Sequence, residues 1–289
     1  MHRTHYRSAA VDGLGIFYRD AGPPEAPCVL LLHGFPSSSR MWQPLIDRLS
    51  DRYRLVAPDY PGFGHSEAPP PDSFAYTFDH IAEVMEGFID VLGLQGYSLV
   101  VQDYGGPVGM RLAVRRPDRV QSLIVHNAVC HEDGLGPLWE TRRAFWADRA
   151  GHEAALRENF FSPAATRLRH VGKSPDPERY DPDLWTDEQA FLDRPGQSDI
   201  QTDLFYDYRT NVDSYSRWQQ WLRGAQPPLL VVWGRYDPSF EVAAAEAYQR
   251  DVPDAPVHIV DAGHFPLDEA PEHVSDLTGR FLDAVVRGN

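Results

Sequence analysis

Short apolar runs separated by stretches with a helical pattern constrain the fold of this chain more than any other feature. Runs of this kind, without polar alternation, are typical of parallel strands that are covered on both faces. They occupy residues 28–32, 53–57, 98–101, 122–125, 229–233 and 257–260. The alternation of strands and helices predicts an α/β domain with right-handed crossover connections.

The segments between these runs supply the helices and one edge of the predicted sheet. Helical patterns cover residues 41–49, 78–92, 104–114, 241–250 and 271–286. The first ~20 residues instead alternate polar and apolar positions, which suits an antiparallel hairpin at the edge of a sheet. The parallel strands should therefore follow a hairpin at the start of the chain.

One long interval breaks this alternation. Between His131 and Trp221 roughly 90 residues pass without a strand-like run, which is too many for a structureless loop in a compact domain. The segment should carry helices of its own. We expect a core domain made of residues 1–130 and 223–289, and an inserted helical cap, called the lid below, made of residues 131–222.

Charge and hydropathy exclude several classes of partner. The formal net charge of −15 argues against nucleic acid or an anionic membrane, because both attract positive surfaces. No secretory signal is visible after Met1, and no run approaches the ~20 apolar residues of a membrane span. A cytoplasmic protein without a membrane partner is expected. Cys28 and Cys130 lie far apart in the sequence and are predicted to be free structural thiols.

The first chemical groups follow two of the early strands. Active sites of open α/β sheets lie beyond the carboxyl ends of the strands. Phe35 follows the run 28–32 in a His-Gly-Phe-Pro segment, where its N–H can donate to an oxyanion. The run 98–101 leads into Asp103 and Tyr104 and then two glycines, a pattern typical of a tight turn that lifts the aspartate above the sheet. Taken alone, Asp103 is also compatible with a helix N-cap.

Two later strand ends complete a pattern. Asp237 follows the run 229–233, and His264 follows the run 257–260. Either residue alone would be weak support for a site. Asp103, Asp237 and His264 stand in the chain order nucleophile, acid and base, and chance rarely supplies that order at three strand ends.

Together these residues resemble the α/β-hydrolase superfamily, and within it the branch of epoxide hydrolases and haloalkane dehalogenases that uses an aspartate nucleophile. The resemblance extends from residues 33–36 through the turn at Asp103 to residues 263–265. It implies an α/β-hydrolase fold: a mostly parallel eight-stranded sheet flanked by helices, with an inserted helical cap. It also implies an enzyme with a catalytic triad.

A carboxylate nucleophile suits attack on saturated carbon and gives a covalent ester that water must break. Asp103 would open the substrate, and His264, oriented by Asp237, would deprotonate the water. The N–H groups of Phe35 and Tyr104 would form the oxyanion hole. This chemistry needs no cofactor, and the scattered histidines show no zinc-like spacing. The expected partners are a small apolar organic substrate and water, for a monomer or a homodimer.

The resemblance does not determine whether the leaving atom of the substrate is an epoxide oxygen or a halide. Epoxide hydrolases of this branch donate a proton from lid tyrosines; Tyr208 is the first candidate, and Tyr215 would share its helical face. Dehalogenases bind the halide with N–H donors that include Trp, and Trp146 could supply one. Tyr104 stands where one dehalogenase subgroup has Trp, and Phe35 stands where Asn or Glu is common. We therefore expect an epoxide hydrolase first and a haloalkane dehalogenase second.

The residues disfavour three further classes of protein. Fluoroacetate-type dehalogenases place arginines beside the nucleophile, where this chain has Tyr104 and Pro107, which disfavours a small acid substrate. Ser66 and Ser98 approach the Gly-x-Ser-x-Gly pattern of serine esterases but lack the small residues of a nucleophile elbow. A hydrolase fold kept only for ligand binding would have lost a catalytic group, whereas all three are present.

Overall fold

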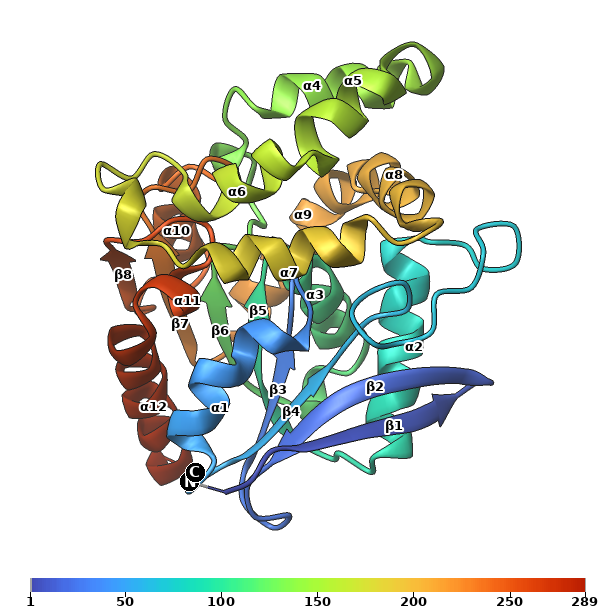
Figure 1. Cartoon of the computed structure of the whole chain (residues 1–289). Coiled ribbons are helices and arrows are strands. Elements are labelled where there is room, and N and C mark those ends of the chain that lie inside the picture. The colour runs from blue at the N-terminus through green and yellow to red at the C-terminus, as the bar shows by residue number, and fades with distance from the viewer. Residues whose placement is uncertain (1, 289) are drawn as a thin grey trace.

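The computed structural model describes residues 2–288 and has an eight-stranded sheet between two layers of helices (Figure 1). Its strands are β1 His5–Val11, β2 Leu14–Ala21, β3 Cys28–Leu32, β4 Arg54–Pro58, β5 Tyr97–Gln102, β6 Val120–His126, β7 Leu229–Gly234 and β8 Val257–Val260. Their order is β1-β2-β4-β3-β5-β6-β7-β8; the pairs β1·β2 and β2·β4 are antiparallel and the others are parallel. All six apolar runs are strands of this sheet, so the predicted α/β-hydrolase architecture is confirmed.

Helices cover both faces of the sheet. The core helices are α1 Gln43–Leu49, α2 Phe78–Val91, α3 Gly105–Arg115, α10 Ala243–Ala247, α11 Pro266–Glu269 and α12 Pro271–Gly288, with 3-10 turns at Ser39–Trp42, Pro117–Arg119 and Tyr248–Arg250. The single helices predicted for residues 41–49 and 241–250 each consist of a 3-10 turn joined to a short α-helix. The other core helices agree with their predicted ranges to within two residues at each end.

Strand β3 explains why two layers of helices are needed. Val29 and Leu31 belong to one hydrophobic cluster and Leu30 and Leu32 to another, and all four are completely buried. Because successive side chains of a strand point to opposite faces, an apolar strand needs cover on both sides. The first cluster is shared with α1 and α12, and the second with α2, α3 and α10.

The predicted lid interval is helical. It contains α4 Trp139–Ala147, α5 Arg149–Phe161, α6 Pro163–Val171, α7 Pro182–Leu192, α8 Gln197–Asp207 and α9 Arg209–Ala225, with 3-10 turns at Glu132–Gly134 and Pro177–Arg179. These helices lie across the carboxyl ends of the strands (Figure 1). Ser162 and Asp181 cap α6 and α7, each of which begins with a proline, as suits a first helical position. The boundary predicted at residue 222 falls inside α9, and the division into two domains stays a prediction.

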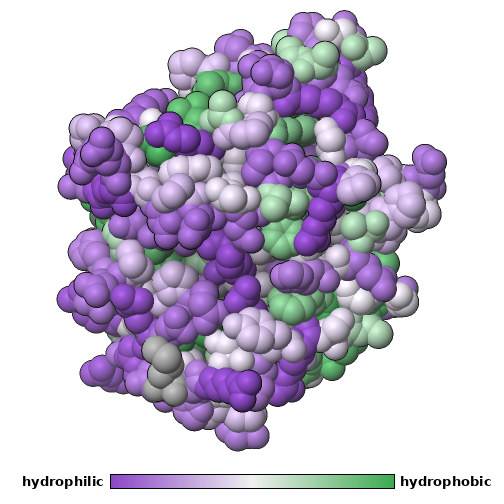
Figure 2. Space-filling view, viewed as in Figure 1, coloured by the Kyte–Doolittle hydropathy of each residue, from purple (hydrophilic) through white to green (hydrophobic). Residues whose placement is uncertain are grey.

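Hydrophilic residues cover most of the face seen in Figure 2, with small hydrophobic patches between them. Among residues 2–288, no helix combines the length and the hydropathy that a membrane span requires. Cys28 and Cys130 are free thiols, as predicted. Cytoplasmic location and the oligomeric state stay predictions.

Candidate active site

Asp103 lies in the turn between β5 and α3, at the carboxyl end of the sheet. Its backbone φ is +47°, in the left-handed region that residues with a side chain rarely adopt. Gly105 permits the turn, because a Cβ at that position would lie 2.0 Å from the carbonyl oxygen of Leu32. The N-cap of α3 is Tyr104, so the alternative of a helix-capping Asp103 does not apply. The strained turn has the geometry of a nucleophile elbow.

Backbone donors fix one oxygen of this carboxylate. The N–H of Phe35 donates to Oδ1 of Asp103 over 2.8 Å. Gly34 allows this approach, since a Cβ there would lie 2.3 Å from the Cβ of Asp103. The N–H of Tyr104 lies at the start of α3, where helices leave amide donors without partners. With Oδ1 held, Oδ2 is the oxygen that faces the imidazole of His264, 3.5 Å from its Nε2.

Asp237 follows β7 and is held by donors on both oxygens. Its Oδ1 accepts from the N–H groups of Ser239 over 2.6 Å and Phe240 over 3.1 Å. Its Oδ2 accepts from the Nδ2 of Asn127 over 2.7 Å and lies 2.8 Å from the Nδ1 of His264. This network fixes the orientation of the carboxylate, and through it the orientation of the imidazole.

Asn127 was missed by the sequence reasoning. It directly follows β6 with a backbone φ of +39°, and its Oδ1 accepts from the N–H of Gly234 over 2.8 Å. Its amide therefore joins the ends of β6 and β7 while it holds Asp237. The available signal was its position: a polar residue immediately past a buried strand, like the three residues that were singled out.

His264 lies between two carboxylates. Burial lowers the pKa of its imidazole, but the charges and hydrogen bonds of Asp237 and Asp103 outweigh burial and raise the pKa to about 9. For Asp103 burial raises the pKa, and the hydrogen bond and charge of His264 together with the N–H of Phe35 bring it below the ordinary value. Gln102 ties the His264 backbone to β5 through a 3.1 Å bond to its carbonyl. At neutral pH the site thus holds an imidazolium between two carboxylates.

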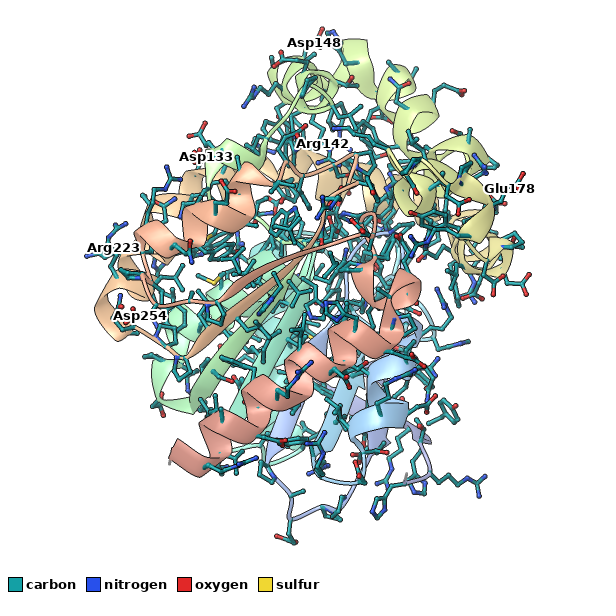
Figure 3. All side chains as sticks on the ribbon, turned by 90° about the vertical axis from the view of Figure 1, so that its left-hand side faces the viewer. Asp133, Arg142, Asp148, Glu178, Arg223 and Asp254 are labelled. Atoms are coloured by element: carbon teal, nitrogen blue, oxygen red, sulfur yellow. The ribbon has the colours of Figure 1, made fainter. Side chains whose placement is uncertain are left out.

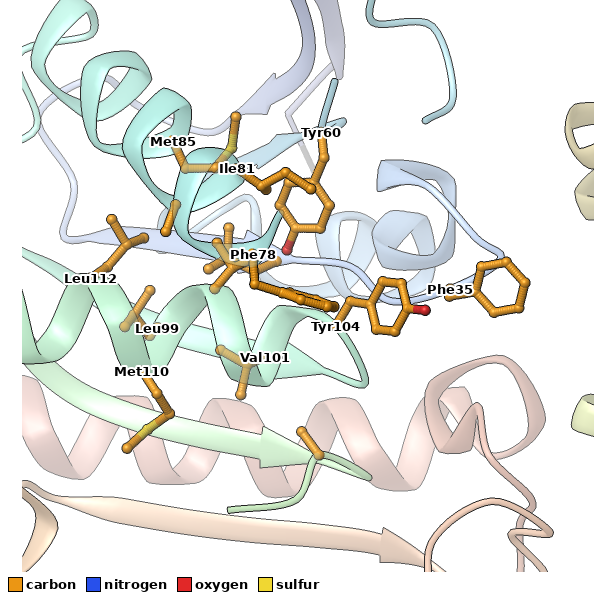
Figure 4. Close-up of a cluster of buried hydrophobic side chains, with 14 of the residues drawn as sticks. Phe35, Tyr60, Phe78, Ile81, Met85, Leu99, Val101, Tyr104, Met110 and Leu112 are labelled. Atoms are coloured by element: carbon orange, nitrogen blue, oxygen red, sulfur yellow. The ribbon is translucent and has the colours of Figure 1, made fainter. Parts of the chain in front are cut away.

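Among residues 2–288, the phenol hydroxyls of Tyr104, Tyr208 and Tyr215 are buried without a hydrogen-bond partner, as are those of Tyr60 and Tyr180. The rings of Tyr104 and Tyr208 are tilted by 43° with 5.9 Å between their centroids, and the hydroxyl of Tyr104 points toward Phe35 in Figure 4. Burial is the main cause that raises the pKa of each phenol, and the charge of Asp103 adds to it for Tyr104 and Tyr208. The phenols are therefore neutral donors, and Tyr208 is the neighbouring group that most affects the pKa of Tyr215.

Trp146, which the sequence offered as a possible donor to a leaving group, has a hydrogen-bond partner within the lid. Its indole N–H donates to the carbonyl oxygen of Phe205 over 2.8 Å, so the donor is already used within the lid. The sequence could not reveal this contact, because it joins two lid helices that are far apart along the chain. Two lid residues that the sequence reasoning did not single out, Arg142 and Arg169, are buried beside the site and are treated below.

The serines weighed as alternative nucleophiles are engaged elsewhere. Ser66 donates to the carbonyl oxygen of Asp59 over 2.7 Å and accepts from the N–H of Phe17. Ser98 accepts from the hydroxyl of Ser122 over 2.8 Å, near the amino ends of β5 and β6. Within residues 2–288, no group of three or more His, Cys, Asp or Glu side chains is arranged to hold a metal ion.

This fold, with a strained aspartate turn and an Asp–His pair at the carboxyl edge of the sheet, defines an α/β-hydrolase. Comparison with known families agrees: the chain belongs to the alpha/beta hydrolase fold family, whose sequence model matches residues 27–271.

The chain is also similar to individual hydrolases. An uncharacterized hydrolase of Saccharomyces cerevisiae, YNR064C, is 38% identical over 262 residues, which cover 89% of each chain. Haloalkane dehalogenase 2 of Mycobacterium tuberculosis is 39% identical over 158 residues, 53% of this chain and 54% of the dehalogenase. The solved structure of the epoxide hydrolase CorEH has a TM-score of 0.80 at 18% identity and covers 98% of this chain and all of that one, a likeness of fold.

Proposed function

We propose that this protein is a hydrolase that forms an alkyl ester on Asp103, with His264 as base and Asp237 as its acid partner, and that its substrate is an epoxide. The observation that carries the proposal is that the two oxygens of Asp103 have different partners. Oδ1 accepts from the N–H of Phe35, and Oδ2 lies 3.5 Å from His264 Nε2. One oxygen is placed in an oxyanion hole and the other is left to react.

In the first step, Oδ2 of Asp103 attacks an epoxide carbon and the bond between that carbon and the ring oxygen breaks. The ring oxygen takes a proton from a phenol, for which Tyr208 and Tyr104 are the candidates. Both hydroxyls are buried without a protein acceptor, so a substrate oxygen is a suitable partner for them. The product of the step is an ester of Asp103 with a hydroxyl on the neighbouring carbon.

Loss of the charge on Asp103 prepares the second step. Two carboxylates raise the pKa of His264 to about 9, and esterification removes one of them. The imidazolium then gives up its proton, which restores the phenol, and becomes a base. Water loses a proton to His264 and adds to Cγ of Asp103. The bond from Cγ to Oδ2 then breaks, and Oδ2 leaves in the diol with the second proton of the water, which restores the carboxylate of Asp103 and the imidazolium of His264. Donors at Phe35 and Tyr104 would stabilise the oxyanion on Oδ1.

A haloalkane dehalogenase is the second candidate, supported by the dehalogenase relative that matches about half of the chain. Carbon–halogen cleavage would use the same two steps without a phenol proton. The residues described above favour the epoxide, since the indole N–H of Trp146 is taken by Phe205 and the side chain after the nucleophile is a phenol.

The test uses the His264→Ala protein, which lacks the base of the second step. We would mix it with a panel of epoxides and haloalkanes, measure intact masses and map the modified peptide. An adduct on Asp103 with the mass of the whole epoxide is expected. Addition of an alkyl group alone would assign the dehalogenase. An acyl adduct on a serine after ester treatment would overturn the aspartate nucleophile.

A further inference from the structure

A guanidinium group lies on the buried face of α4. Arg142 shares that face with Trp139 and Phe145, one helical turn before and after it, and only 7% of Arg142 is exposed. The next residue, Arg143, is exposed. Figure 3 shows Arg142 on the inner side of the lid, whereas the labelled Asp148 lies at the outer edge of the molecule.

A second guanidinium group joins it from α6. Arg169 is 5% exposed, and its Cζ lies 4.5 Å from the ring centroid of Phe35. The Cζ of Arg142 lies 5.1 Å from the ring centroid of Phe205, which contacts the ring of Phe35. Both arginines also contact the ring of Phe160, with Cζ distances of 4.8 and 6.0 Å. The two cations therefore line the same aromatic wall, and Phe35 in that wall binds the nucleophile.

Neither arginine has an anionic partner. Among residues 2–288, no carboxylate oxygen forms an ion pair with Arg142 or Arg169 within 4.0 Å. The Nε of Arg142 and the Nη1 of Arg169 are buried without any acceptor. The Nη2 of Arg169 donates to the carbonyl oxygen of Phe160 over 2.7 Å. Aromatic rings attract a cation but replace only part of its hydration.

Burial of two unpaired cations is costly. Burial first and the charge of Arg142 second lower the pKa of Arg169 to about 10. The charge of Arg142 also helps to lower the pKa of Asp103, after burial, His264 and Phe35. The charges of Asp103 and Glu188 act in the opposite direction and raise the pKa of Arg169, but neither carboxylate forms an ion pair with it. A buried charge without a partner is strongly destabilising, so the two guanidinium groups favour a bound anion.

A cleft of about 40 Å³ reaches Arg169 from the seam between the lid and the core. Its lining includes Phe160 and Ser239, and Ser239 donates its N–H to Asp237. At this cleft Leu138 and Leu168 are exposed large hydrophobic side chains, 42% and 48% exposed. The cleft therefore extends from solvent to Phe160 of the aromatic wall, whereas the three side chains of the triad are buried.

We propose that Arg142 and Arg169 bind the carboxylate of the substrate, so that the natural substrate is a small acid that carries the electrophilic carbon. The proposal rests on the proposed function and extends it from an apolar epoxide to an epoxy acid. The sequence disfavoured an acid because Tyr104 and Pro107 flank the nucleophile. In the structure the lid supplies the cations instead, from two helices that the sequence could not place.

The experiment compares matched substrates and matched variants. Glycidate and its neutral amide, glycidamide, have the same epoxide and nearly the same shape. The kcat/KM of the wild type is expected to be at least about 10-fold higher for the acid, a typical effect of charge-assisted hydrogen bonds. Arg142→Met and Arg169→Met should each lower kcat/KM for glycidate about 10-fold or more and change it for glycidamide less than about 3-fold. Arg143→Met and Arg167→Met, at exposed neighbours in the same helices, should change neither.

Wild-type binding gives a readout that does not depend on folding of the variants. Propionate, which lacks an electrophile, is expected to bind measurably by calorimetry, and propionamide at least about 10-fold more weakly. Arg142→Lys and Arg169→Lys retain the charge and should keep part of the preference for the acid.

Two results would overturn the proposal, and they are distinguishable. Equal turnover of glycidate and glycidamide, or equal loss of both in the arginine variants, would leave the epoxide hydrolase in place and refute the carboxylate site. Absence of any Asp103 adduct with epoxides or haloalkanes in the His264→Ala protein would refute the proposed function, and the acid substrate with it.

Discussion

The rim of the core and the underside of the lid contribute to this site in different ways. In the core, Asp103, Asp237 and His264 follow the ends of strands, and backbone N–H groups hold the two carboxylates. In the lid, Tyr208 lies at the junction of α8 and α9 and Arg142 lies in α4, and both pack against aromatic rings. Groups at strand ends are held in a fixed geometry by the backbone. Side chains of the lid are held by packing, so a single substitution can change which groups face the substrate. The difference suggests that the core sets the reaction and the lid sets the substrate.

Substitution of Asp237, the acid of the triad, should have the largest effect and should distinguish the role of the core from that of the lid. Asp237→Asn should lower turnover of any substrate by roughly 10³- to 10⁴-fold, because the imidazole loses its partner charge and its preferred tautomer. Its imidazole should also titrate below the wild-type pKa of about 9, since a raised pKa falls when the raising charge is removed. NMR titration of histidine-labelled protein measures this shift.

Asp261→Asn is the matched control for that variant. Asp261 lies in the same loop as His264, is exposed, and pairs with Arg235 over 2.8 Å. Its loss should leave turnover and the titration of His264 unchanged. A His264 pKa that stays near 9 in Asp237→Asn would contradict the charge arrangement described here.

Removal of the buried phenol hydroxyls should lower the turnover of epoxides but not of haloalkanes. Tyr208→Phe or Tyr104→Phe should lower kcat for epoxides by roughly 10- to 100-fold, because a general acid is lost while the second phenol partly replaces it. Tyr215→Phe should have a smaller effect, since Tyr208 is the neighbouring group that most affects the pKa of Tyr215. Rates with haloalkanes should not change, because a halide leaves without a proton. Tyr206→Phe is the control, since its ring packs against Phe145 in the same part of the lid.

Trp146→Phe should have the smallest effect on catalysis. Loss of its bond to Phe205 should cost about 1 kcal/mol of stability, seen as a lower Tm, and change kcat for epoxides and haloalkanes less than about 3-fold. A loss of haloalkane turnover above about 10-fold at unchanged Tm would restore Trp146 as a halide donor. That result would also shift the second candidate function to first place.

The same contrast explains what could be predicted from the sequence. The strands were recognisable because each is a continuous apolar run, and the elbow because a tight turn needs glycines at fixed positions next to Asp103. The contact of Trp146 with Phe205 and the cluster of Arg142 with Arg169 depend on how separate helices pack. No local pattern encodes such packing. Asn127 is an intermediate case. Its position after a strand can be read from the sequence, but its hydrogen bond to Asp237 cannot, because that bond depends on which strand lies beside β6 in the sheet.

Oxygen labelling tests the central claim, the ester on Asp103, most directly and in the unmodified enzyme. A single turnover of an epoxide in H₂¹⁸O, with enzyme in excess, followed by peptide mapping, locates the oxygen that water delivers. Because water attacks Cγ of Asp103, the heavy oxygen should enter the peptide that contains Asp103, and the diol should carry only light oxygen. Heavy oxygen in the diol with an unlabelled Asp103 peptide would mean that water attacks the substrate directly, which contradicts the covalent mechanism.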